Sequence, residues 1–289
     1  MFKVVLGFAI LAGVAIQDSS QILTCSVTGD PHYRTFTGKD INFQGVCQYT
    51  LVKDDTKTFT VLGRAENSCG RSVSCTDEVT ILVKKLDIVI KRGGTVTVFG
   101  HDKKLPYCRR GVSIKKIGNK VTVTTDVGLT VDYDGLYNAN INIGDEFSGT
   151  LSGICGEYNG KTSKDLVKPD RTDAGNDQDF VDSWKVNKSC PKPPDIPNPC
   201  DNSLSKLKAA NGECKKLERP PFSACHDHVK VDSYIEDCIY DICHSKRPRE
   251  FPKFYCESYA SYVDTCKRAD VNITWPKNLL KGCKEYLGR

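Results

Sequence analysis

Residues 112–125 read VSIKKIGNKVTVTT, and this stretch decides the fold of the first part of the chain. Two runs with largely alternating apolar and polar residues flank the pair Gly118-Asn119. Alternation with a period of two is typical of a strand with one buried face, and such a pair suits a two-residue hairpin turn. The stretch therefore predicts an antiparallel hairpin with strands at residues 112–117 and 120–125.

Similar short runs continue on both sides of this hairpin. They lie at residues 49–53, 59–64, 79–83, 86–91, 96–99, 129–132 and 140–143. Turn-forming residues such as Gly, Asn and Asp separate them. Many short strands at regular spacing predict an all-β sandwich or barrel.

The composition limits the class of protein. The chain has 289 residues, which is enough for about two domains, and 39% of them are hydrophobic. The net charge of +5 is too small to indicate a nucleic-acid-binding protein. Fifteen cysteines are unusual for a reducing compartment and indicate disulfides in a secreted protein.

The N-terminus fits that compartment. Residues 4–16 (VVLGFAILAGVAI) follow Lys3 and form an apolar run that is too short to cross a bilayer. Small residues precede the expected cleavage after Ala15. We expect residues 1–15 to be a secretory signal peptide, and we expect a secreted, extracellular product without a membrane anchor.

The second part of the chain has a different residue pattern. Residues 190–200 (CPKPPDIPNPC) contain a proline-rich linker at 191–199. Beyond it, helical spacing of apolar residues predicts helices at 202–211, 232–244 and 255–267. Eight cysteines at 200–283 indicate four bridges in a small helical module, and the sequence leaves their connectivity open.

Several strings resemble known domains. Residues 25–33 (CSVTGDPHY), 47–49 (CQY) and 152–160 (SGICGEYNG) resemble the von Willebrand factor type D domain, and Phe180 with residues 183–186 (SWKV) resembles its closing strand. The string CIYDIC at 238–243, with the cysteines that follow, is similar to the eight-cysteine (C8) module. The resemblance implies a disulfide-rich β-sandwich or barrel at 25–190 and a small α-helical, disulfide-stapled module at 200–283, as in secreted mucin-like or zonadhesin-like matrix proteins.

The same resemblance implies a cysteine map for the first domain. The implied bridges are Cys25–Cys155, Cys47–Cys190 and Cys69–Cys75. Because fifteen is an odd number, one thiol is left over or bonds another chain, and Cys108 is the candidate. The neighbouring Arg109 and Arg110 would favour a reactive thiolate. A buried, inert cysteine is the alternative.

One departure from the family concerns assembly. Multimerising members carry a Cys-Gly-Leu-Cys string in the late loop, whereas this chain has Ser152-Gly153-Ile154-Cys155. Dithiol exchange needs both sulfur atoms. We therefore do not expect disulfide-linked multimers.

The resemblance also implies a calcium ion at the late loop. Its ligands would be Glu157, Asn159 and Asp165, which carry the oxygen donors that Ca²⁺ requires. Thr37 and Lys164 stand where the family has Asp and Asn, and both changes should weaken binding. The alternative is an ordinary solvated loop.

The string at residues 29–32 (GDPH) is a second candidate for chemistry. Some type D domains that share it cut themselves between Asp and Pro at mildly acidic pH. Here the bond would be Asp30–Pro31, and His32 could donate the proton. The alternative is structural, with Pro31 shaping the strand entry and Asp30 capping the turn.

Surface features indicate further partners. Basic pairs lie at 84–85, 103–104, 109–110 and 115–116. They form either a solvated face or a weak surface for sulfated glycans or acidic mucins. Asn187 and Asn272 begin N-glycosylation sequons, as in a secreted glycoprotein.

The sequence as a whole indicates a secreted, non-enzymatic protein of the matrix, mucus or adhesive type. A calcium-stabilised type D domain would bind other secreted proteins or glycans. One alternative is a gland or venom constituent that acts on another organism. Another is a luciferase-like oxidoreductase, since ostracod luciferases resemble assemblies of two such domains, although this chain has only one.

Overall fold

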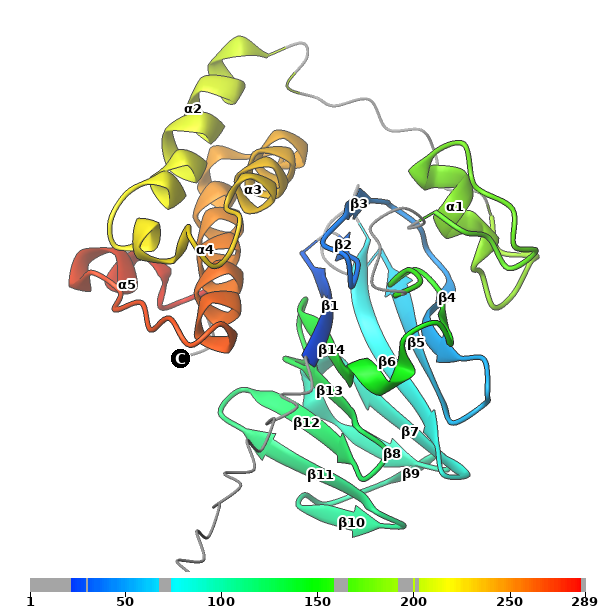
Figure 1. Cartoon of the computed structure of the whole chain (residues 1–289). Helices are drawn as coiled ribbons and strands as arrows, with labels where there is room; N and C mark the ends of the chain where they lie inside the picture. Colours follow the sequence, from blue (N-terminus) through cyan, green and yellow to red (C-terminus); the bar gives the residue numbers. More distant parts are fainter. Residues whose placement is uncertain are drawn as a thin grey trace, which may run out of the picture.

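The computed structural model describes residues 22–29, 31–67, 74–158, 166–191, 200 and 203–286. It has a β-rich part followed by a helical part (Figure 1). The β-rich part contains two antiparallel sheets, so the fold class expected from the sequence is confirmed. The expected signal peptide and most of the proline-rich linker lie outside the described residues.

The first sheet has eight strands in the order β10-β11-β12-β13-β14-β1-β2-β3. Their bounds are β1 Ile22–Thr28, β2 His32–Arg34, β3 Asp40–Asn42, β10 Tyr107–Arg109, β11 Val112–Ile117, β12 Lys120–Thr125, β13 Leu129–Tyr133 and β14 Ala139–Gly144.

The second sheet has seven strands in the order β15-β4-β5-β6-β7-β8-β9. Their bounds are β4 Gln48–Asp54, β5 Phe59–Glu66, β6 Cys75–Val83, β7 Leu86–Lys91, β8 Val96–Val98, β9 His101–Asp102 and β15 Leu151–Ser152.

The predicted hairpin is present. Ile117 pairs with Lys120, which leaves Gly118 and Asn119 as the two turn residues. Gly118 has a φ of 62°, in the left-handed region that a glycine adopts without steric cost. Short connections also join β10 to β11, β12 to β13 and β13 to β14, whereas β14 pairs with the distant strand β1.

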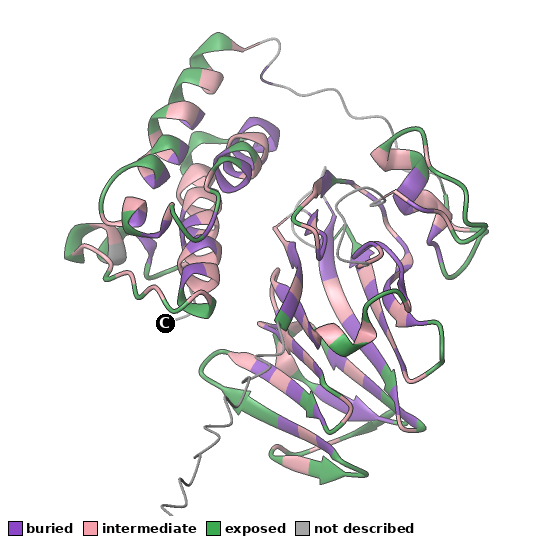
Figure 2. Ribbon diagram, viewed as in Figure 1, coloured by how far each residue is buried: buried purple, intermediate pink, exposed green. Residues whose placement is uncertain are grey.

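The core lies between the two sheets (Figure 2). It is formed by the inward-facing residues, which alternate with outward-facing ones along each strand. Examples with no exposed surface are Ile81, Ile88, Val123 and Ile141. Burial of one such side chain contributes about 1.5–3 kcal/mol relative to exposure. The many side chains of this kind make apolar burial the main stabilising term of the β domain.

The closing strand expected at residues 180–186 is wrong for its first half. Residues Asp177–Ser183 form helix α1, and the side chain of Asn176 caps it by accepting a hydrogen bond from the amide of Asp179. An asparagine cap with acidic residues in the first turn favours a helix. Only the following segment runs beside β4, where Lys185 forms an isolated bridge with Tyr49.

Among its described residues, the helical part contains four further α-helices, together with short 3-10 helices. Their bounds are α2 Leu204–Cys214, α3 Asp232–His244, α4 Phe251–Arg268 and α5 Lys277–Cys283. The predicted helix at 232–244 coincides with α3. Helix α4 begins before the predicted residue 255, because Pro252 in its first turn needs no hydrogen-bond partner for its nitrogen.

Disulfides connect both parts internally. In the β domain the structure joins Cys25 to Cys155 and Cys47 to Cys190, the two long-range pairs that the resemblance implies. Cys75 is also disulfide-bonded, and its expected partner Cys69 lies outside the described residues. The helical module contains the pairs Cys200–Cys243, Cys214–Cys238, Cys225–Cys266 and Cys256–Cys283. Within the described part of the chain, no helix has the length and apolar character needed to span a membrane.

Candidate functional site

The two parts meet where the β1–β2–β3 edge of the first sheet approaches α3 (Figure 1). Ser233, Asp237 and Asp241 are spaced by four residues on α3, so they share one face of the helix. Ser233 and Asp241 are buried, although neither belongs to an apolar core. Helix α3 therefore turns a polar stripe toward the β domain.

His32 is the centre of this contact. It is 4% exposed, and its Nε2 lies 3.0 Å from Asp241 Oδ1. Its Nδ1 lies 3.1 Å from Asp237 Oδ1 and 2.7 Å from Asn42 Oδ1. The ring also meets the ring of Tyr240 edge-on, with 5.7 Å between the centroids. Since a protonated imidazole donates from both nitrogens, it can bond both carboxylates of α3 at once.

The charges around His32 favour its protonated form. Burial by itself lowers the pKa of His32, but the carboxylates of Asp237 and Asp241 outweigh burial and hold that pKa well above its usual value. Burial raises the pKa of nearby Asp40 to about 6, against the opposing effect of Arg34. The contact is thus built for a positive imidazole between negative groups.

Gly29 allows the close approach of α3. Its φ is +58°, and a Cβ added there would lie 3.1 Å from Asp241 Oδ2 and 3.3 Å from the His32 ring. A side chain at this position would disturb both partners of the His32–Asp241 pair. The glycine that begins the GDPH string is therefore required by the second module as well as by the turn.

Arg34 extends the same contact along α3. Its guanidinium donates to the Ser233 hydroxyl and lies 5.3 Å from the centre of the Tyr234 ring. It also lies 3.6 Å from Asp40 of its own domain. One arginine therefore makes a hydrogen bond and a cation–π contact across the boundary.

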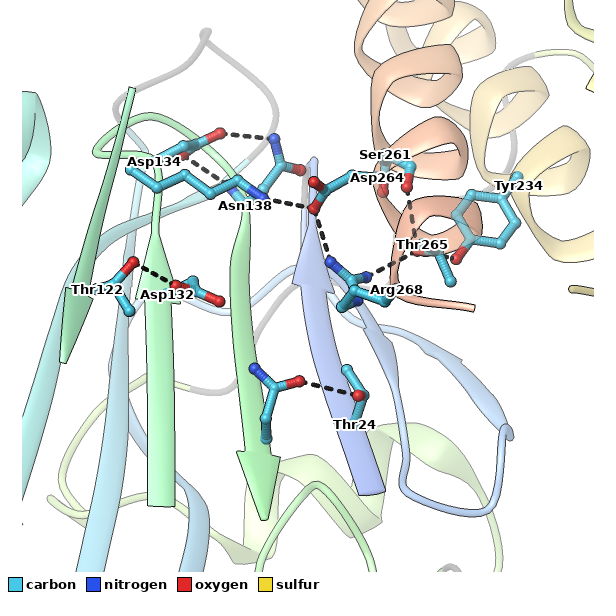
Figure 3. A network of polar contacts seen from close by, with 12 residues as sticks. Thr24, Thr122, Asp132, Asp134, Asn138, Tyr234, Ser261, Asp264, Thr265 and Arg268 are labelled. Atoms are coloured by element: carbon cyan, nitrogen blue, oxygen red, sulfur yellow. Dashed lines mark hydrogen bonds and ion pairs between the residues drawn. The ribbon is translucent and has the colours of Figure 1, made fainter. Parts of the chain in front are cut away.

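A second set of contacts joins the first sheet to α4 (Figure 3). Lys120 forms an ion pair with Asp264, which Arg268 also contacts at 2.6 Å. Burial raises the pKa of Asp264, but Lys120 and Arg268 outweigh it and the net shift is downward. Lys253 places its ammonium 4.4 Å from the centre of the Tyr137 ring. Cation–π and ionic contacts thus replace apolar packing here.

Two polar cavities lie within this boundary. One, of about 20 Å³, is lined by His32, Asp237 and Asp241 together with Glu257. The other, of about 100 Å³, lies between Asn138 and Lys120 on one side and Ser261 and Asp264 on the other. The first domain and the helical module have separate apolar clusters. Hydrogen bonds and charges, rather than shared apolar packing, hold the two parts together.

The structure changes the role expected for His32. Asp30 lies outside the described residues, and Pro31 is buried. Both ring nitrogens of His32 face carboxylates of α3, so its protons are already committed. Because its pKa is raised well above the usual value, His32 stays charged through the mildly acidic range and does not switch there. Cleavage at Asp30–Pro31 remains a prediction, but a proton from His32 would first have to leave this pairing.

The calcium ligands expected from the resemblance are described only in part. Asn159 and Asp165 lie outside the described residues. Glu157 forms an ion pair with Arg171, with 2.6 Å between Oε1 and Nη1, and Arg171 also contacts Asp55 at 2.5 Å. Among the described residues, no group of three or more His, Cys, Asp or Glu side chains could hold a metal ion. A calcium ion at Glu157 would compete with the Arg171 guanidinium for this carboxylate.

The remaining predicted sites are on the surface. Cys108 is exposed on strand β10 and is not disulfide-bonded. Asn187 and Asn272 are both exposed, as an acceptor of a glycan needs to be. The Asn187 side chain accepts hydrogen bonds from the amide and hydroxyl of Ser189, the third residue of its sequon.

Sequence reasoning missed the α3 and α4 partners of the β domain. The available signal was the spacing of Ser233, Asp237 and Asp241 on a helix whose other face is apolar. Such a stripe is usually solvated, so the spacing alone does not indicate a docking face. The partner of His32 follows it by 209 residues, and no local pattern connects the two.

Comparison with known proteins gives two family matches. The model of the von Willebrand factor type D domain matches residues 25–172, and the model of the C8 domain matches residues 213–284. The chain is 32% identical to SCO-spondin of Rattus norvegicus over 255 residues, which cover 87% of this chain and 5% of that protein. It is 32% identical to Mucin-5AC of Homo sapiens over 269 residues, which cover 89% of the chain and 5% of the relative.

Zonadhesin of Sus scrofa is a third relative, with 30% identity over 261 residues that cover 86% of this chain and 10% of zonadhesin. The chain thus spans only 5% to 10% of the length of these relatives.

Proposed function

Since the chain belongs to the von Willebrand factor type D domain family, we propose that it is a secreted, non-enzymatic protein of the matrix, mucus or adhesive type. Its partners would be other secreted proteins or glycans. The relatives named as a mucin, a spondin and a zonadhesin support this class. So does the disulfide-rich architecture, which is typical of extracellular proteins.

The docking of the two parts at His32 is the observation that carries the proposal. A binding protein gains affinity when its surface is fixed in advance, because less conformational freedom is lost on binding. Disulfides close each part internally, and the His32 and Asp264 contacts hold the two parts in one arrangement. The chain therefore presents a two-part surface as a single unit.

Retention on extracellular material tests the proposal. The full chain would be expressed in a secretory cell line and collected from the medium. It would then be passed over immobilised mucus and matrix glycoproteins, beside an unrelated secreted disulfide protein of similar charge. We expect selective retention of the native protein and its loss after reduction and alkylation. Intracellular accumulation, or retention no greater than that of the control protein, would contradict the proposal.

Calcium is part of the proposed function in a restricted form. Glu157 can supply one carboxylate to an ion at the late loop, in line with the ligand type that Ca²⁺ prefers. In the described structure Arg171 already neutralises that carboxylate. We therefore propose a weak calcium response that the Arg171 pair limits.

A further inference from the structure

A shallow groove lies on the outer face of the second sheet, near the tips of its hairpins. The strand register places Lys53 beside Thr60, Thr60 beside Leu82, and Leu82 beside Asp87. These four side chains form a row across β4, β5, β6 and β7. Phe99 adjoins the row, because its amide donates to the Asp87 carbonyl at 2.9 Å. The groove has a volume of about 430 Å³ and is open to solvent.

The groove exposes apolar surface beside cations. Phe99 is 47% exposed and Leu82 is 39% exposed, and they are two of only six large hydrophobic side chains exposed to this degree among the described residues. Lys57 and Lys85 are exposed at the rim. Apolar side chains exposed together in a concave surface are typical of a binding site.

The backbone around the groove is unusual for its residue types. Lys84 and Lys85 have φ values of 51° and 59°, and they are the two turn residues between β6 and β7. Asn-Gly or a similar pair is normally found in such a turn. Lys57 and Phe99 are also left-handed, with φ values of 68° and 53°. The sequence therefore keeps three lysines and a phenylalanine where smaller residues would fit the backbone better. Strain of this kind gathers at functional sites.

One lysine and one carboxylate of the groove are already paired with residues outside it. Lys84 pairs with Asp126 at 2.5 Å, and Asp55 pairs with Arg171. Within the described residues, Lys57 and Lys85 have no ion-pair partner. The groove therefore retains cations that can meet an anionic group.

Further positive charge lies beside this rim. Arg110 donates to the Lys85 carbonyl at 3.3 Å, which brings the Arg109-Arg110 pair next to the Lys84-Lys85 turn. Two of the four basic pairs in the sequence, 84–85 and 109–110, thus lie side by side at this end of the groove. Lys115 and Lys116 lie along β11 instead and do not line the groove.

The groove has one exposed carboxylate, which can accept hydrogen bonds from a ligand, and one buried carboxylate. Asp87 is exposed and forms no ion pair with another described residue. Asp54 is 2% exposed, and its Oδ2 accepts from the Thr58 amide at 3.1 Å. Its Oδ1 has no hydrogen-bond partner among the described residues. The exposed carboxylate of Asp87 can accept hydrogen bonds from the hydroxyls of a ligand.

We propose that this groove binds an anionic saccharide, a pyranose that carries a sulfate or a carboxylate. The apolar face of the ring would lie on Phe99 and Leu82, its hydroxyls would donate to Asp87, and its anionic group would meet Lys57 and Lys85. An acidic peptide suits the groove less well, because it offers few hydroxyl donors to the Asp87 carboxylate. The inference rests on the proposed adhesive function. It adds to that function the class of ligand that one surface of the β domain binds.

The test measures binding of defined saccharides to the full secreted chain by calorimetry. The probes are a 6-sulfated N-acetyllactosamine oligosaccharide, its unsulfated form, a sialylated lactose and a poly-glutamate peptide. The sulfated and sialylated probes distinguish the source of the negative charge. Thermal melting of each variant shows that it is folded before its binding is compared.

Three variants separate the groove from general charge. Lys57→Gln combined with Lys85→Gln removes the two rim cations, and we expect roughly a tenfold loss of affinity for the anionic probe. Phe99→Asn removes the ring and suits a left-handed backbone, and we expect about a fivefold loss. Lys115→Gln combined with Lys116→Gln removes the same charge elsewhere, and we expect less than a twofold loss.

Equal losses of affinity in the two lysine double variants would overturn the site. The net positive charge of the protein, rather than the groove, would then explain the binding. Tighter binding of poly-glutamate than of either anionic saccharide would overturn the ligand class. If the saccharide binds as expected but the chain is not retained on glycoproteins, only the proposed function fails. If retention holds while no groove variant weakens saccharide binding, only this inference fails.

Discussion

The β domain and the helical module reach stability by different means. The buried cluster of the β domain is dominated by aliphatic and aromatic side chains from two sheets. In the helical module, eight of the seventeen residues in the buried cluster are cysteines, all of which form disulfides. A small module buries too little apolar surface to stabilise itself without such cross-links. The difference teaches that one chain can combine a core that folds by burial with a core that folds by covalent closure.

The boundary between the two parts is neither an apolar core nor a region closed by disulfides. It includes ion pairs of His32 and Lys120 with acidic residues of α3 and α4, and contacts of Arg34 with the Ser233 hydroxyl and the Tyr234 ring. Polar boundaries of this type are weaker than cores and respond to pH and charge. Disturbing each of the three regions should therefore have a distinct signature.

The largest effect should follow the loss of a disulfide from the helical module. The Cys225–Cys266 bridge spans 41 residues and the Cys25–Cys155 bridge spans 130. In the chain-entropy model each stabilises the folded state by about 4–5 kcal/mol. We expect Cys225→Ser with Cys266→Ser to unfold the module, whereas Cys25→Ala with Cys155→Ala weakens the β domain without unfolding it. Hydrogen exchange measured by mass spectrometry in each part checks this. The comparison would be reversed if the β domain lost its protection and the module kept it.

An intermediate effect should follow the removal of His32. His32→Ala removes the cation that lies between Asp237 and Asp241, and breaking a buried pair in this way costs about 3–5 kcal/mol. The substitution should weaken the docking of the helical module on the β domain, since it leaves both cores intact. We expect faster exchange in α3 and β2 and a larger radius of gyration in X-ray scattering. His101→Ala, which changes an exposed histidine outside this contact, is the control and should leave both unchanged.

The same contact should respond to pH in a defined direction. Because the His32 pKa is raised, its contribution is full below the ordinary pKa of about 6.5 and is lost as the pH rises through the raised value. Asp40, with a pKa raised to about 6, also favours the docked state when protonated at lower pH. We expect higher protection factors in α3, after correction for the intrinsic exchange rate at each pH, at about pH 5.5 than at about pH 8.5, and a smaller difference in His32→Ala. Equal protection factors at both pH values in the native chain would refute this.

A smaller effect concerns calcium at Glu157. Arg171→Gln frees this carboxylate, so the stabilisation by calcium should increase. A ligand at tenfold its dissociation constant adds about 1.4 kcal/mol. We expect the melting temperature in millimolar Ca²⁺ to exceed that in EDTA by more in Arg171→Gln than in the native chain. Identical melting curves in both buffers, for both proteins, would show that the loop binds no calcium.

The smallest effect on stability should come from Cys108. It is exposed and lies outside both cores, so Cys108→Ser should change the free energy of unfolding by less than about 0.5 kcal/mol. The native chain should take up one equivalent of iodoacetamide without denaturant, and the variant should take up none. Labelling that requires denaturant would show that the thiol is protected in solution.

Local chemistry explains why so much of the β domain could be predicted. The pair Gly118-Asn119 forms its turn between neighbours in sequence, and alternation assigns each strand an inner and an outer face. The errors also have local causes. The cap at Asn176 turned part of an expected strand into α1, and strands as short as β9 and β15 are too brief to show a period.

By itself, the sequence determined the two-part organisation, the strand-rich first domain and a disulfide-built second module, because periodicity, turn residues and cysteine content are properties of short segments. Only the tertiary structure decided that His32 lies between Asp237 and Asp241. The same is true of the ion pair between Arg171 and Glu157. It is also true of the groove that the Lys84-Lys85 turn and Phe99 line together. These contacts join residues far apart in the chain. They depend on how whole strands and helices pack, and that packing is set by the sum of many contacts rather than by any one motif.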